Sequence, residues 1–79
     1  MNKILPLNSL KVGEKGCVQS VMSNIAERRR LLNLGLINGT IVEVLHKSPA
    51  GDPTAYSIMG AVIALRNADA KNILVQMHL

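Results

Sequence analysis

The chain has 79 residues, which is enough for one small domain and too few for two, so residues 1–79 form a single predicted domain. Its single cysteine excludes a disulfide within the chain, which is typical of a reducing compartment. Nine basic and five acidic residues give a charge of +4, which is compatible with nucleic acid, an acidic protein face or anionic lipid and does not choose among them.

The first predicted strand and helix follow one another near the start of the chain. The strand covers residues 17–22, after a polar, glycine-containing turn at residues 11–16. A helix begins near Ile25, because Asn24 can accept a hydrogen bond from the free amides of the first turn. Glu27 stands three residues after Asn24, where its carboxylate can complete a capping box.

The sequence also predicts where this helix ends. Gly35 tolerates the left-handed backbone that closes a helix, and Leu36 is placed to contact Leu31 as in a Schellman motif. On a helical wheel one broad apolar arc is formed by Ile25, Leu31, Leu32 and Leu34. We therefore expect this arc to face a sheet, so that the helix plugs or caps the fold.

Four further strands are predicted from alternating or β-branched runs between turns, at residues 40–47, 54–59, 61–66 and 73–77. A proline- and glycine-containing loop at residues 48–53 and a tight hairpin turn at Gly60 separate them. A short helical turn at residues 67–71, with Asn67 as its cap, precedes the last strand. Five short strands and one inserted helix predict a mainly β fold, a small and partly open antiparallel barrel.

One long segment has the pattern of a known family. Residues 28–53, RRRLLNLGLINGTIVEVLHKSPAGDP, combine an arginine–leucine helix, an L-G-L-x-x-G-T turn and a G-D-P loop, and Tyr56, Gly60, Ala64–Leu65–Arg66 and Ile73–Leu74–Val75 follow in order. From about Leu10 to Val75 the chain resembles the FeoA family. The resemblance implies a five-stranded SH3-like barrel with one short inserted α-helix and a short helical turn before the last strand.

The resemblance also implies a function. Proteins of this kind are accessory or regulatory components of bacterial ferrous-iron uptake, and they act with a membrane ferrous-iron transporter that bears a cytosolic GTPase domain. Docking rather than chemistry is the implied role. The same domain type resembles the C-terminal module of diphtheria-toxin-type, iron-dependent repressors.

The run Arg28–Arg29–Arg30 is a candidate contact for an acidic partner surface, because guanidinium groups pair with carboxylates in a forked geometry. Consecutive helical positions point in different directions, so at most two of the three can meet one partner. Arg28 falls inside the apolar arc, and we expect Arg29 and Arg30 to hold the transporter. The alternative is a solvated helix face, which such runs often are.

Apolar residues beside the helix stop are further candidates for partner binding. Leu36 and Ile37, with Ile41 and Leu45 on the next strand, are left over when the predicted core is assembled, and they form either an interface or packing under the helix or the N-terminal segment. Asp52 is expected to cap the amides of its neighbours in the Gly51–Asp52–Pro53 turn, and also to join a docking rim. This turn lacks the lysine and the serine or threonine of a phosphate-binding loop.

Metal binding and catalysis have little support in the pattern. His46 and Cys17 are the candidates for ligands of Fe²⁺ or Zn²⁺, but like His78, Asp52 and Glu14 they occur singly and not at ligand spacing. No nucleophile, base and orienting group stand at readable spacing either, so we predict a protein that is not an enzyme.

Two other functions compete with the accessory role. A small nucleic-acid-binding barrel fits the calculated isoelectric point near 9.7, but the chain offers one tyrosine and no other aromatic for base stacking, so no nucleic acid is expected. A free-standing transition-metal sensor related to the repressor module is the other.

The sequence has no transmembrane run and no signal peptide, which predicts a cytoplasmic protein. Exposed strand edges leave homodimerisation open.

Overall fold

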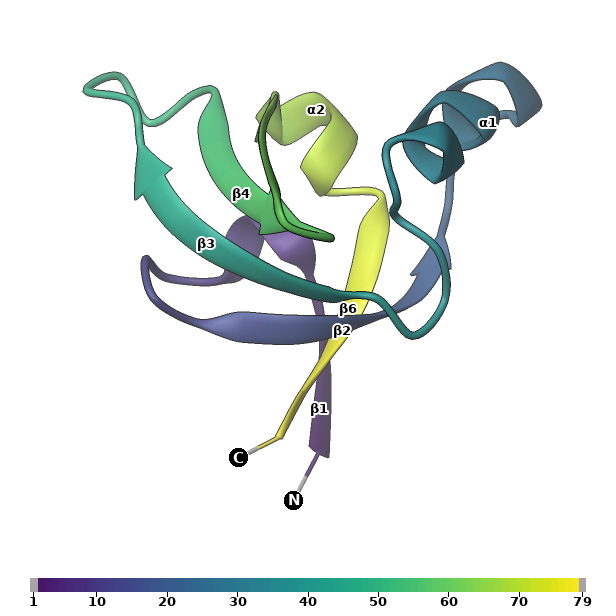
Figure 1. Cartoon of the computed structure of the whole chain (residues 1–79), viewed down its shortest axis with the longest axis horizontal. Helices are drawn as coiled ribbons and strands as arrows, with labels where there is room; N and C mark the ends of the chain where they lie inside the picture. Colours follow the sequence, from purple (N-terminus) through teal and green to yellow (C-terminus); the bar gives the residue numbers. More distant parts are fainter. Residues whose placement is uncertain (1, 79) are drawn as a thin grey trace.

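Six antiparallel strands form one strongly curled sheet in the computed structural model, which describes residues 2–78 (Figure 1). The strands are β1 (Asn2–Pro6), β2 (Lys15–Val21), β3 (Ile41–Lys47), β4 (Thr54–Ile58), β5 (Ala61–Leu65) and β6 (Ile73–His78). Their order across the sheet is β1-β6-β2-β3-β4-β5. A 3₁₀ turn η1 (Leu7–Ser9) and two helices, α1 (Ile25–Asn33) and α2 (Asn67–Ala70), complete the fold. Neither helix of the described chain is long and apolar enough to cross a membrane.

The prediction of five strands missed β1. This strand pairs antiparallel with β6, with Lys3 opposite Met77 and Pro6 opposite Leu74. The segment shows no clean alternation and contains a proline, which argues against a central strand. At an edge position, however, proline is tolerated because its missing N–H can face away from the ladder.

Asn24 as the N-cap of α1 and Gly35 as its C-terminal stop are confirmed. The side chain of Asn24 accepts a hydrogen bond from the amide of Glu27 at 2.9 Å. At the other end, Gly35 has a φ of 102°, and the amides of Leu36 and Gly35 bond to the carbonyls of Leu31 and Leu32 at 3.1 and 3.0 Å. These two bonds define a Schellman motif.

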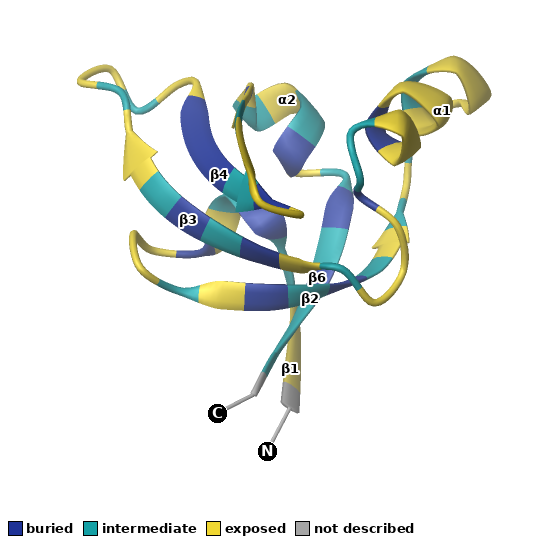
Figure 2. Cartoon of the chain, in the orientation of Figure 1, coloured by how far each residue is buried: buried dark blue, intermediate teal, exposed yellow. Residues whose placement is uncertain are grey.

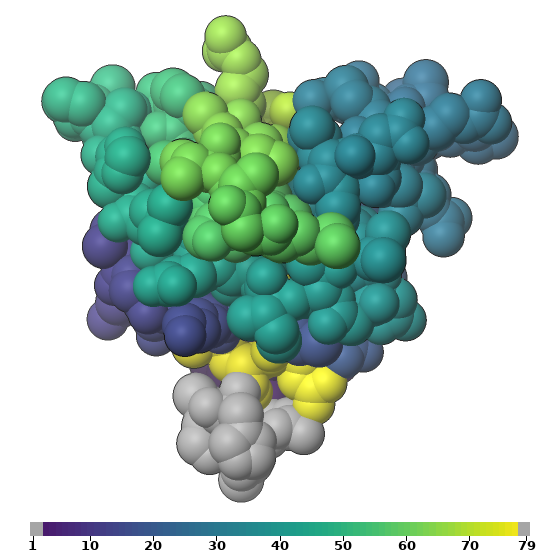
Figure 3. Space-filling model, in the orientation of Figure 1, coloured from purple at the N-terminus to yellow at the C-terminus, as the bar shows by residue number. Residues whose placement is uncertain are grey.

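The hairpin of β4 and β5 turns through two residues, Met59 and Gly60, whose φ angles of 49° and 82° are those of a type I′ turn. In the space-filling view the green atoms of this hairpin lie at the front, beside the teal atoms of α1 and the turn after it (Figure 3). The hairpin turn and the end of α1 are in contact: Met59 lies so close to Gly35 that a Cβ added to this glycine would be 2.9 Å from Sδ of Met59.

The core is aliphatic and is built around Tyr56, the largest of its fully buried side chains (Figure 2). It joins residues from five of the strands, from η1 and from both helices. Its members are Leu7, Leu10, Val18, Leu31, Leu36, Val42, Val44, Tyr56, Ile58, Leu65, Ala70, Ile73 and Val75. Val42 and Val44 of β3 face it as the alternation predicts.

The expected orientation of α1 is only partly confirmed, because Leu31 and Leu34 of the predicted arc turn towards the core and the other two residues do not. Ile25 is 80% exposed and Leu32 is 39% exposed, whereas Leu31 is fully buried and is the one such residue in α1. The helix extends from the side of the sheet, and most of its surface is exposed (Figures 1 and 2). The side of α1 that faces the rest of the fold carries Leu31, with Glu27 and Leu34 half-buried beside it at helical spacing, and Arg30 lies exposed at its margin.

Burial gives Tyr56 a testable dependence on pH. Burial raises the pKa of its hydroxyl above the usual value of 10.0, and the Thr54 side chain partly opposes this rise. Above pH 10 the unfolded chain loses the tyrosine proton first, so it binds fewer protons than the folded chain and stability falls as pH rises. We expect urea unfolding between pH 9 and 11 to show a steeper loss of stability for the wild type than for Tyr56→Phe. Identical slopes would contradict this.

Candidate functional site

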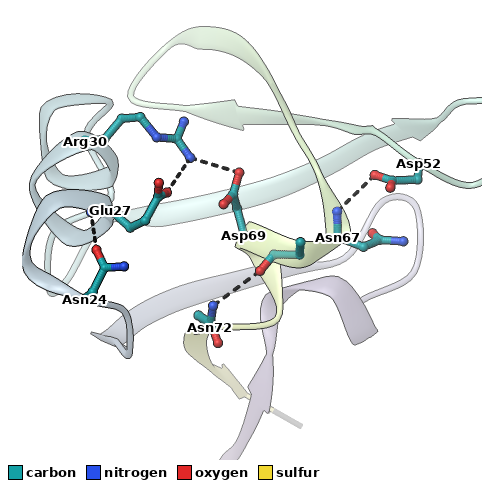
Figure 4. A network of polar contacts seen from close by, with 8 residues as sticks. Asn24, Glu27, Arg30, Asp52, Asn67, Asp69 and Asn72 are labelled. Atoms are coloured by element: carbon teal, nitrogen blue, oxygen red, sulfur yellow. Dashed lines mark hydrogen bonds and ion pairs between the residues drawn. The ribbon is translucent and has the colours of Figure 1, made fainter.

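Arg30 is exposed, but its guanidinium is already paired within the fold, which makes it a weaker candidate for partner binding than its two neighbours. Its Nη2 atom donates to Glu27 Oε2 at 3.0 Å and to Asp69 Oδ2 at 2.9 Å (Figure 4). Both hydrogen bonds raise the pKa of the Arg30 guanidinium above its usual value, and the bond to Glu27 has the larger effect. Because Asp69 belongs to α2, Arg30 ties the two helices together, and Glu27 serves this contact rather than a capping box.

Arg28 and Arg29, in contrast, are exposed, and no described residue forms an ion pair or side-chain hydrogen bond with either. They lie three and four residues after Ile25 and four and three before Leu32, which places all four on one side of the helix. We call Ile25, Arg28, Arg29 and Leu32 the outer face of α1. It combines two unpaired positive charges with two exposed apolar side chains.

The apolar residues after the helix separate into core and surface. Leu36 is fully buried, so its predicted place in a docking surface is wrong: the Schellman turn directs it into the core. Ile37 is 46% exposed and remains accessible to a partner. On β3, Ile41 is 55% exposed and Leu45 is half-buried.

Asp52 has a structural contact that its sequence position did not suggest. Its Oδ1 atom accepts a hydrogen bond from the amide of Asn67 at 2.9 Å (Figure 4). The carbonyl of Gly51 accepts a second one from Asn67 Nδ2 at 3.4 Å. The carboxylate therefore serves the first turn of α2, where negative charge is favourable, rather than its neighbours in the loop. The prediction that Asn67 caps α2 is therefore wrong by one position, because Asn67 is the first helical residue and Arg66 is the N-cap, without a side-chain capping hydrogen bond.

The metal-ligand candidates do not come together. Cys17 lies opposite Ile41, while His46 lies opposite Ala55 towards the other end of β3. Glu14 is engaged with the amide of Lys11 at 2.6 Å. No group of three His, Cys, Asp or Glu residues that could hold a metal ion occurs among the described residues, and the side chain of His78 lies outside them. The side chains that are described therefore do not fit a Fe²⁺ or Zn²⁺ site.

A family model and a curated relative match nearly the whole chain. The FeoA domain model matches residues 5–77. A protein of Porphyromonas gingivalis, named an Fe(2+) transport protein A/Fe(2+) transporter FeoB fusion protein, is 31% identical over 71 residues. The match covers 90% of this chain and 8% of the relative, so the chain spans a small part of that protein.

Solved structures agree with this match. The FeoA protein of Chlorobium tepidum, solved by NMR, is 36% identical with a TM-score of 0.88 over 95% of this chain and 71% of that chain. The FeoA of Stenotrophomonas maltophilia, complexed with zinc and named a prokaryotic SH3 domain protein, is 31% identical with a TM-score of 0.78 over 91% and 94%. The predicted SH3-like fold is thus confirmed, with six strands instead of five.

A more distant likeness concerns the fold alone. A manganese-dependent transcriptional repressor, solved in complex with manganese, is 20% identical with a TM-score of 0.85 over 95% of this chain and 37% of that chain. The likeness agrees with the predicted relation to repressor modules at the level of architecture.

Proposed function

The chain belongs to the FeoA family, and on that premise we propose that it is a non-enzymatic accessory protein of bacterial ferrous-iron uptake. It works in the cytoplasm by docking on the cytosolic, GTPase-bearing part of the membrane ferrous-iron transporter. The observation that carries this proposal is the P. gingivalis relative, which is named as a fusion of the two proteins. Fusion keeps two domains at high effective concentration, which is useful when they act together.

The outer face of α1 is the docking surface in this proposal. Arg28 and Arg29 have no partner among the described residues, so their guanidinium groups can pair with carboxylates without breaking an existing contact. Ile25 and Leu32 flank them and offer apolar area that a partner would cover. The complementary surface of the partner would be acidic with an apolar centre. On this protein, Ile37 in the turn after α1 is a candidate for the margin of the docking surface.

The competing functions find less support in the structure. Tyr56 is the single aromatic residue of the chain and is 1% exposed, so no aromatic side chain is offered to a base for stacking. A metal sensor needs a set of ligands, and the described residues gather none. Docking, in contrast, needs only the exposed side chains of the outer face of α1.

Charge reversal on the outer face tests the docking proposal. We expect Arg28→Glu/Arg29→Glu to weaken binding to the purified cytosolic part of the transporter by at least about tenfold, equivalent to about 1.4 kcal/mol. The reason is that two attractive contacts become repulsive. Biolayer interferometry at two salt concentrations measures the effect, and wild-type affinity should fall as salt rises.

A matched control separates this surface from overall charge. Lys11→Glu/Lys47→Glu makes the same change in charge at two exposed positions, in the loop before β2 and at the end of β3, on the side of the molecule opposite α1 (Figure 1). We expect it to bind within about twofold of the wild type. Equal losses in both variants, or none in either, would refute docking through α1.

A further inference from the structure

The two edges of the sheet differ in how they are protected. Exposed strand edges are usually blunted by lysine, proline or a bulge, because unpaired backbone groups otherwise recruit another strand. The β1 edge contains Lys3 and Pro6. The β5 edge reads Ala-Val-Ile-Ala-Leu, with no charge and no proline, and its register with β4 runs without a bulge. Of the two edges, β5 is therefore the one open to pairing.

The register shows which backbone groups of β5 point outward. Ile58 and Ala61 flank the two-residue turn and so exchange hydrogen bonds, and bonding then alternates along the strands. Ala61, Ile63 and Leu65 therefore bond to β4. Val62 and Ala64 direct their N–H and C=O groups away from β4, and within residues 2–78 no strand pairs with that edge.

The surface around these groups is apolar and accessible. Val62 is 69% exposed, and Ala64 is also exposed. The hairpin lies at the front of the space-filling view, where no other segment covers it (Figure 3). A strand that paired here would gain backbone hydrogen bonds and would also shield Val62 from water.

We propose that the occupant of this edge is β5 of a second copy of the chain, paired antiparallel about a two-fold axis at Ile63. In this register Val62 of each copy faces Ala64 of the other, so all four outward groups of each strand find partners. Arg66 lies opposite Gly60 of the second copy, which keeps like charges apart in a protein of charge +4. The strand is thus complementary to itself in both hydrogen bonding and charge.

The contact is small, and this sets the expected strength of the dimer. Two five-residue strands meeting at their edges belong with interfaces that bury less than about 1,200 Å² in total, which are weak or transient. The dimer should therefore form reversibly as concentration rises. It does not use the outer face of α1, so it does not rest on the docking proposal.

Paired charge variants test both the dimer and its register. Sedimentation equilibrium of the wild type should show an apparent mass rising from 8.5 kDa towards twice that value with concentration. In Val62→Lys/Ala64→Lys each lysine would face a lysine of the second copy, so this variant should stay monomeric. In Val62→Lys/Ala64→Glu each lysine would face a glutamate, so this variant should dimerise again, less strongly at high salt.

The amides give a second measurement with residue resolution. Hydrogen exchange at Val62 and Ala64 should slow as the wild-type concentration rises, whereas exchange along β1 should not change. A wild type that stays at 8.5 kDa up to millimolar concentration would overturn the proposal. So would equal dimerisation of the two charge variants, because the contact would then lie elsewhere or follow another register.

Discussion

Replacing Tyr56 with alanine is expected to remove most of the free energy of unfolding at 25 °C and to leave a marginally stable protein. Tyr56 is 1% exposed and is the largest fully buried side chain of the core. Removing a large buried aromatic ring costs about 3–5 kcal/mol, because burial is lost and a cavity is left. A domain of this size has a free energy of unfolding near the low end of about 5–15 kcal/mol, so the substitution removes most of it.

The conservative substitution at the same position is the control. Tyr56→Phe keeps the ring and removes the hydroxyl, so it should unfold within about 1.5 kcal/mol of the wild type. Urea unfolding followed by far-ultraviolet circular dichroism measures the wild type and both variants. A Tyr56→Ala protein as stable as Tyr56→Phe would contradict the central place given to this ring.

Leu31→Ala is expected to have the second-largest effect, and its effect should concentrate on α1. Leu31 is the one fully buried side chain of this helix, and its loss should cost about 2–5 kcal/mol. The helix would then keep the partial packing of Leu34 and the ion pair of Arg30 with Asp69 at 2.9 Å, an exposed contact that adds little to stability. Hydrogen exchange should show the amides of α1 opening before those of the sheet.

The neighbouring leucine provides the comparison for Leu31. Leu32 is 39% exposed on the outer face of α1, so Leu32→Ala should cost less than about 1 kcal/mol. If the helix instead packed through the outer face that carries Ile25 and Leu32, the two variants would rank in the opposite order. Comparing their unfolding midpoints therefore tests the orientation of the helix directly.

Local signals in the sequence predicted local structure well. Asn24, Gly35 and Leu36 specify the ends of α1 through bonds that span three to five residues, and such bonds depend on neighbouring residue types. The strands from β2 onwards followed from alternation and turn residues. The segment of β1 lacked both signals. Its partner β6 lies at the far end of the chain, so no neighbouring residues indicate the pairing.

Hydrophobicity alone could not predict which side of α1 packs against the core. The predicted arc comprised Ile25, Leu31, Leu32 and Leu34, but of these the helix turns inward Leu31 and Leu34 and leaves Ile25 and Leu32 exposed. The ion pair of Arg30 with Asp69 on the same side joins residues 39 positions apart in sequence, and a contact over this distance has no local pattern. The same applies to Asp52, whose partner Asn67 is 15 residues away.

These corrections change which residues the candidate site contains. Arg30, Leu36 and Asp52 were predicted to bind a partner, yet each has a contact within the fold. Arg28 and Arg29 remain, and the exposure of Ile25 and Leu32 adds two residues that had been assigned to the core. The sequence indicated α1 as a candidate for docking, and the structure shows which of its side chains are exposed.

The most direct test of docking through α1 is an NMR titration of the ¹⁵N-labelled protein with the cytosolic part of the ferrous-iron transporter. The account predicts that amide shifts change first at Ile25, Arg28, Arg29 and Leu32 and in the following turn at Ile37, with β1 and β6 unaffected. Shifts that cluster on β1 and β6 and leave α1 unchanged would contradict it, as would no shift at saturating concentration.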